Sequence, residues 1–93
     1  MAFSYSDENF TVVGNLCFVH IILDGRTRMI DIPPAIVDRM LYSGIVCNYP
    51  YFSSGSSTST KGIGYAFINN SKISLSDVGE GYLYFYFPID SNK

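Results

Sequence analysis

The run from Leu16 to Asp24 constrains the fold more than any other part of the chain, because it is apolar on both faces of a β-strand. Successive side chains of a strand point to opposite faces. One set is Leu16, Phe18, His20 and Ile22, and the other is Cys17, Val19, Ile21 and Leu23. A strand of a two-layer domain normally shows one polar face. We therefore expect that this strand lies between two packed layers, or that its second face is covered by another subunit.

The flanking sequence predicts that this strand is the middle one of an antiparallel meander. Gly14-Asn15 precedes the run and Asp24-Gly25 follows it, and both dipeptides are typical of tight hairpin turns. Short β-rich runs, FTVV and TRMIDI, lie beyond these turns. Pro33-Pro34 ends the third run, because proline lacks the N–H group that a ladder needs.

The rest of the chain is also typical of short strands. We expect a short strand or N-terminal arm over residues 1–9, and a loop with about one helical turn over 35–41. Further strands are expected at 42–51, 62–69, 72–76 and 82–89. The polar run SSGSSTST (53–60) predicts a mobile surface loop. Seven to eight short strands with no dependable helix indicate an all-β antiparallel sandwich.

Length and composition predict one domain, spanning residues 1–93, that associates with other subunits. The chain is 47% hydrophobic and 16% aromatic, which excludes disorder. It is only 15% charged, so little charge is available to cover a free surface. The net charge of −2 offers no basic footprint, and we expect no nucleic-acid partner.

Membrane insertion and secretion are not expected. No apolar run reaches the length of a membrane span. The N-terminus MAFSYSDENF lacks the basic start and apolar centre of a signal peptide, so we expect a soluble protein made in the cytoplasm. Cys17 and Cys47 stand in apolar strand context without metal-ligand spacing. We expect buried free thiols, and the sequence leaves a disulfide open.

Residues for catalysis or metal binding are not gathered in any recognisable motif. The single histidine, His20, lies in mid-strand and reads as a packed or interface residue. Asp77 and Glu80 share one turn and could bind a cation or a sugar hydroxyl, although solvated turn acids are commoner. Paired carboxylates typical of a glycosidase are not recognisable. We expect no enzyme, no catalytic residue, no metal and no cofactor.

Aromatic residues are the remaining signal. Tyr rings pack on sugars, yet they are also enriched at subunit interfaces. For the Tyr residues of the last strand an inter-subunit or inter-sheet face is favoured, and for the aromatic residues beside the serine-rich run binding and packing weigh equally. The predicted ligand-binding residues are Tyr49, Tyr51, Phe52, Asp77 and Glu80. The predicted oligomer-interface residues are Leu16, Phe18, His20, Ile22, Tyr82, Tyr84 and Tyr86.

The order of three motifs resembles the C-terminal head or tip domains of bacteriophage tail fibres and receptor-binding proteins. These motifs are Val13-Gly14-Asn15-Leu16, the step Ile32-Pro33, and Lys72-Ile73-Ser74-Leu75, within a stretch that covers residues 10–89. The resemblance implies a jelly-roll-like sandwich, a homotrimer and a place at the tail tip of a virion. It also implies that the partner is a bacterial cell-surface glycan or protein. No binding residue carries over, because the matched positions are fold-making ones.

These observations lead to one main hypothesis and two alternatives. The main hypothesis is a non-enzymatic receptor-binding tip that recognises a bacterial surface saccharide. The first alternative is a structural domain that trimerises or caps a fibre. The second is a small stand-alone phage inhibitor that binds a host protein.

Overall fold

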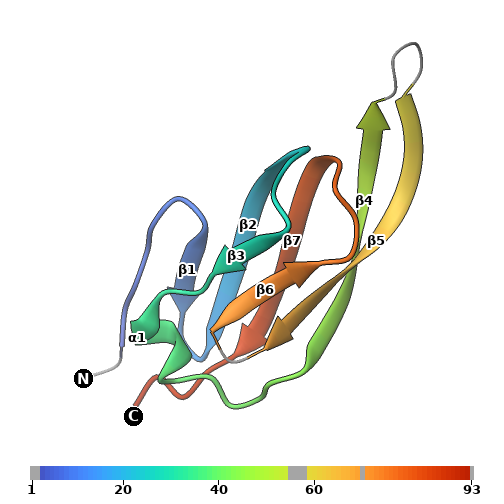
Figure 1. Cartoon of the computed structure of the whole chain (residues 1–93). Coiled ribbons are helices and arrows are strands. Elements are labelled where there is room, and N and C mark those ends of the chain that lie inside the picture. The colour runs from blue at the N-terminus through green and yellow to red at the C-terminus, as the bar shows by residue number, and fades with distance from the viewer. Residues whose placement is uncertain (1–2, 55–58, 70, 93) are drawn as a thin grey trace.

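The computed structural model describes residues 3–54, 59–69 and 71–92, and it shows an all-β sandwich with one short helix (Figure 1). This confirms the predicted fold class. The elements are β1 (Phe10–Val13), β2 (Leu16–Asp24), β3 (Met29–Asp31), α1 (Pro34–Val37), β4 (Ile45–Ser54), β5 (Ser59–Asn69), β6 (Lys72–Leu75) and β7 (Glu80–Pro88).

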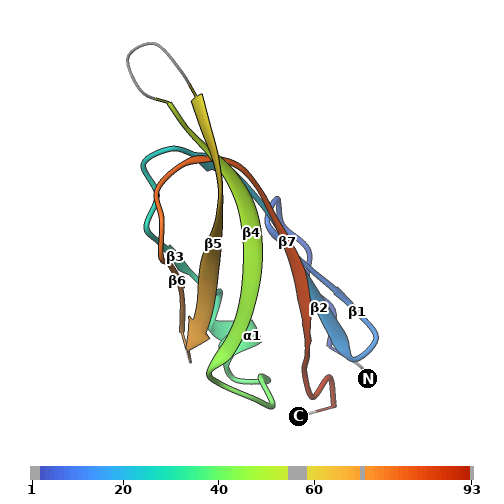
Figure 2. The same cartoon turned by 90° about the vertical axis from the view of Figure 1, so that its right-hand side faces the viewer.

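The strands form two antiparallel layers that are joined at one crossing. Their hydrogen-bonded order is β1-β2-β7-β4-β5-β6-β3. β2 and β7 pair along their whole length, from Leu16↔Pro88 to Asp24↔Glu80. β4 and β7, in contrast, pair only at Phe52↔Glu80 in the part of the chain that the structure describes. The two strands splay apart beyond this pair, so the β1–β2–β7 sheet and the β4–β5–β6–β3 sheet face each other (Figure 2).

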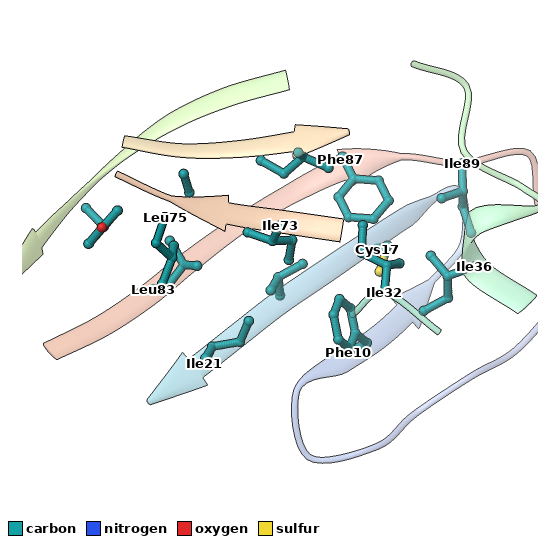
Figure 3. Close-up of a cluster of buried hydrophobic side chains, with 14 of the residues drawn as sticks. Phe10, Cys17, Ile21, Ile32, Ile36, Ile73, Leu75, Leu83, Phe87 and Ile89 are labelled. Atoms are coloured by element: carbon teal, nitrogen blue, oxygen red, sulfur yellow. The ribbon is translucent and has the colours of Figure 1, made fainter. Parts of the chain in front are cut away.

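The core fills the space between the two sheets, and the predicted alternation accounts for it. In β2 the inward set is buried and the outward set is not, as a period of two requires. β6 turns Ile73 and Leu75 inward, and β7 does the same with Leu83 and Phe87. Ile36 of α1 packs at one end of this cluster (Figure 3).

The connection after β2 differs from the predicted second hairpin. β3 pairs with β6 of the opposite sheet, with Ile30 opposite Ile73, and not with β2. The reason is that β1 and β7 already flank β2 on its two sides. Asp24-Gly25 still makes a tight turn: Gly25 has φ 84, and the Asp24 carboxylate accepts the N–H groups of Arg26 and Thr27. This turn carries the chain across to the second sheet. The meander is therefore right for β1–β2 and wrong for β2–β3.

The predicted loop over 53–60 is wrong at both of its ends. Ser53 pairs with Thr60 and Ser54 with Ser59, so these residues extend the β4–β5 hairpin, while residues 55–58 lie outside the described part. A backbone ladder does not need apolar side chains to continue. Pro50 does not close β4 as expected, because β4 has one partner strand there and can spare an N–H group. The hairpin projects beyond the sandwich (Figure 1). With it, the protein measures 53 Å along its longest axis.

The described part of the N-terminal segment packs on the domain. Ser6 forms a bridge with Thr11 of β1, and Phe3 donates its N–H to the carbonyl of Ser91. The Arg39 guanidinium lies 3.8 Å from the centre of the Phe3 ring, a cation–π contact. The predicted helical turn within 35–41 is present as α1. No helix in the described ranges has the length and apolar character needed to cross a membrane.

Glycine is required where β4 crosses β7. A Cβ atom at Gly81 would lie 2.8 Å from the Pro50 carbonyl oxygen and 3.4 Å from the Tyr51 Cα. Both obstacles are backbone atoms, which cannot swing aside. The strands can therefore approach closely at this point because residue 81 has no side chain.

We expect Gly81→Ala to lower the free energy of unfolding by about 1–3 kcal/mol, the range typical of overpacking. Gly62→Ala is the matched control. Its Cβ would meet the Tyr51 ring at 2.6 Å, but that half-buried ring can rotate away, so the loss should be smaller. Urea unfolding followed by circular dichroism measures both variants. An equal loss in the two proteins would contradict the backbone origin of the effect.

Candidate binding face and groove

The outward side chains of β2 and β7 form a continuous surface, which we call the aromatic face. Its six members are Phe18, His20, Ile22, Tyr82, Tyr84 and Tyr86. They meet in cross-strand pairs: Phe18 with Tyr86, His20 with Tyr84, and Ile22 with Tyr82. The His20 and Tyr84 rings stack with centroids 4.5 Å apart and planes 13° from parallel. Phe18 and Tyr86 lie 5.6 Å apart. Cross-strand pairs of this kind stabilise the β2–β7 sheet.

The aromatic face is exposed in the single chain. Tyr84 and Tyr86 each keep 62% of their surface exposed, and Ile22 keeps 67%. No Asp, Glu, Lys or Arg stands at the outward positions of the two strands until the Asp24–Glu80 pair at one end. The structure thus brings six of the seven predicted interface residues together. The seventh, Leu16, is half-buried at the opposite end, across from Pro88. That another subunit covers this face stays a prediction.

A second exposed apolar patch lies on the outer face of the other sheet and was not predicted. It consists of Val46, Ile63, Tyr65 and Phe67. The signal that could have found it is the alternation in GIGYAFIN, where Gly, Gly and Ala separate large side chains. This patch is interrupted by the exposed Asn48 opposite Tyr65 and is bordered by the Lys72–Asp31 ion pair.

A groove opens at the end of the aromatic face that lies beside the β4–β7 crossing. Its volume is about 590 Å³, and its lining is Ile22, Leu23, Asp24, Pro50, Glu80, Gly81 and Tyr82. Asp24 and Glu80 are directly opposite each other in the β2–β7 ladder. Hydrogen bonds from the Arg26 N–H and from the Thr27 hydroxyl and N–H lower the pKa of Asp24. This carboxylate therefore stays ionised at mildly acidic pH. The groove combines an apolar wall with two carboxylates.

The prediction that Tyr49 binds a ligand is wrong, because this residue is 1% exposed. Its ring lies over Gly64 of β5, where an added Cβ would stand 2.5 Å from the ring. Its hydroxyl donates to the Asp77 carbonyl at 2.7 Å and accepts the Asp77 N–H at 3.2 Å. Tyr49 therefore fastens the turn before β7 to β4.

The other predicted ligand residues separate into two places. Tyr51 is half-buried, and burial together with the nearby Asp77 carboxylate raises the pKa of its hydroxyl. The Asp77 carboxylate accepts a hydrogen bond from the Ser76 hydroxyl and does not line the groove. The side chain of Phe52 lies outside the described residues. Glu80 is exposed and lines the groove. Among the predicted residues whose side chains the structure describes, only Glu80 stands in the groove, and Asp24 and Tyr82 were missed as its companions.

Both cysteines are free thiols, as expected. Burial raises the pKa of Cys17 to about 11, with a smaller effect from the charge of Asp7. Cys47 is half-buried, where complete burial was expected, and its pKa is also raised by burial. Both shifts keep the thiols protonated at neutral pH. Among the described residues, no three His, Cys, Asp or Glu side chains gather where they could hold a metal ion.

Comparisons with protein-family models, with curated proteins and with solved structures gave no match to this chain.

We expect Tyr49→Phe to lower the free energy of unfolding by about 1–2 kcal/mol. The change leaves the N–H and carbonyl of Asp77 without their partner in a part-buried place. Tyr65→Phe is the control, because this tyrosine is exposed on the outer face of the other sheet, and the variant should unfold as the wild type does. Urea titrations of the three proteins measure the difference. Equal stability of Tyr49→Phe and wild type would remove the anchoring role.

Proposed function

We propose that this domain is a non-enzymatic adhesion module, the host-receptor-binding tip of a bacteriophage tail fibre or baseplate protein. In this proposal it works on the virion and binds a bacterial surface saccharide in the groove. The observation that carries the proposal is the composition of the groove, in which the Tyr82 ring and Ile22 stand beside the carboxylates of Asp24 and Glu80.

The chemistry of this lining suits a saccharide. A sugar presents an apolar ring face that packs on aromatic and aliphatic side chains, and hydroxyls that donate to carboxylate oxygens. Tyr82 and Ile22 offer the first kind of contact, and Asp24 and Glu80 the second. A volume of about 590 Å³ falls within the range of ordinary ligand sites. The crossing fixes Pro50 and Gly81 in the wall, which limits the ordering cost of binding.

Binding without hydrolysis is the reading that the environment of the two carboxyls supports. They do form an opposed pair at the strand ends, an arrangement that the sequence alone did not reveal. A glycosidase, however, needs one carboxyl in surroundings that keep it protonated near neutral pH. Asp24 and Glu80 are both exposed, and the pKa of Asp24 is lowered.

The resemblance to tail-fibre tips supplies the wider setting of this proposal. The motif Val13-Gly14-Asn15-Leu16 forms the β1–β2 hairpin, with Gly14 at φ 61. Ile32-Pro33 leads from β3 into α1, and 72–75 is β6. The motif residues thus make turns and core, so they support a shared fold without designating a receptor.

A structural cap is the second candidate, and the uncharged aromatic face favours it. A domain that only terminates or trimerises a fibre would bury this face and would need no ligand in the groove.

We expect Glu80→Gln and Tyr82→Ser to weaken saccharide binding by about tenfold or more, because each removes one kind of contact in the groove. The measurement is binding of the purified protein to immobilised bacterial cell-wall glycans. The control is Tyr65→Ser, an equally exposed tyrosine of the other sheet, which should bind as the wild type does. Circular dichroism checks that each variant is folded. Wild-type protein that binds no glycan would refute the proposal in favour of the structural cap. An equal loss of glycan binding in Tyr65→Ser would show that the saccharide site is not the groove.

A further inference from the structure

We propose that the aromatic face is covered by a second copy of this chain, packed face to face about a two-fold axis. This axis lies in the interface and crosses the strands at the His20–Tyr84 pair, so that the β2 strands of the two copies run in opposite directions. The inference rests on the aromatic face and stands whether or not the groove binds a saccharide.

The area of the face is close to what a stable dimer needs. Aromatic side chains bury about 150–250 Å² each when fully covered. At the observed exposures, Phe18, the three Tyr residues and Ile22 still present roughly 500 Å² of apolar surface. His20 adds to this area, which approaches the ~600 Å² per partner at the lower end of specific interfaces. The largest apolar patch of a typical monomer covers about 300–600 Å², and such a patch is often a functional site.

The composition of the face fits a copy of itself better than a charged partner. Interfaces are enriched in Tyr and Phe and depleted in Lys, Glu and Asp. The outward positions from Leu16 to Ile22 and from Tyr82 to Pro88 contain none of the charged residues. The outer patch of the other sheet differs, because Asn48 and the Lys72–Asp31 ion pair interrupt or border it. From Phe18 to Ile22 and from Tyr82 to Tyr86, the face therefore meets an identical face without burying an Asp, Glu, Lys or Arg side chain.

The position of the acidic pair selects the symmetry. Asp24 and Glu80 stand at one end of the face, so each copy has two carboxylates there. A three-fold axis along the strands, as the resemblance implies, would gather the carboxylates of all copies at the same end. A two-fold axis along the strands would do the same. A two-fold axis across the strands places the two acidic pairs at opposite ends, where their repulsion is weakest.

The proposed axis also matches the shapes along the face. It sets Phe18 opposite Ile22 of the other copy and Tyr86 opposite the other Tyr82, while His20 and Tyr84 meet their own copies at the centre. Ring packs against ring over most of the contact, which aromatic pairs favour. The buried Tyr hydroxyls need partners, and the His20 imidazole at the centre can serve as donor or acceptor.

The first experiment tests the occupant of the face. Sedimentation equilibrium of the wild type over about 1–100 µM should show a reversible dimer, as an interface of this size implies. Tyr84→Asp and Phe18→Asp should weaken the dimer by tenfold or more, because each would bury an unpaired charge. Tyr65→Asp, on the other sheet, should leave it unchanged. A wild-type monomer throughout this range, or dissociation by Tyr65→Asp alone, would overturn the inference.

The second experiment tests the axis and does not depend on the charged variants folding. Single variants Phe18→Cys and Ile22→Cys are made in a Cys47→Ser background, in which buried Cys17 stays unreactive. With a short bis-maleimide cross-linker, a mixture of the two variants should cross-link faster than either variant alone, because residue 18 of one copy faces residue 22 of the other across the axis. Faster cross-linking of each variant with itself, or a trimer in sedimentation, would overturn the two-fold arrangement. Glycan binding by a strictly monomeric protein would remove this inference and leave the proposed function intact.

Discussion

The close approach of β4 and β7 at Gly81 is the constraint on which the rest of the structure depends. Here the Pro50 carbonyl takes the space that a side chain at residue 81 would need. The single pair Phe52↔Glu80 joins the two sheets at this point in the described chain. A longer β4–β7 ladder would hold the strands in one twisted sheet, with no enclosed volume for the core. The crossing is thus what turns seven hydrogen-bonded strands into a sandwich.

The same crossing assembles the candidate site. It places Pro50 of β4 beside Ile22 and Tyr82 of the other sheet, so that strands of both sheets line the groove. Tyr49 holds the turn before β7 against β4 through both backbone groups of Asp77. The Tyr49 ring fits because its partner across the ladder is Gly64, where any side chain would collide with it. The pairs Tyr49↔Gly64 and Tyr51↔Gly62 thus stand on either side of Pro50, which lines the groove.

How much the sequence predicts depends on whether a property is local. The face on which a side chain lies is local, and the period of two correctly places Cys17, Ile73 and Leu83 inside and Tyr84 outside. The partner of a strand is not local. Asp24-Gly25 is a good turn in either case, and only the occupation of both sides of β2 sends β3 to the other sheet. Likewise Tyr49 and Tyr84 are both strand tyrosines, and of the two only Tyr49 lies on an inward face, where Gly64 leaves room for its ring. The groove escaped prediction because Asp24, Pro50 and Tyr82 meet through two such pairings.

The distribution of charge links the groove with the aromatic face. Asp and Glu stand in turns or at strand ends, and none stands at the centre of the β2–β7 face. The ends of the sandwich are therefore well hydrated. The aromatic face of β2 and β7, in contrast, favours contact with another apolar surface. Ile22 and Tyr82 belong to both the groove and the face. A saccharide in the proposed groove would touch Ile22 and Tyr82, which would also meet the second copy in the proposed dimer, so the two binding events would be coupled. By reciprocity, whatever a ligand does to self-association, self-association does to the affinity for that ligand by the same factor.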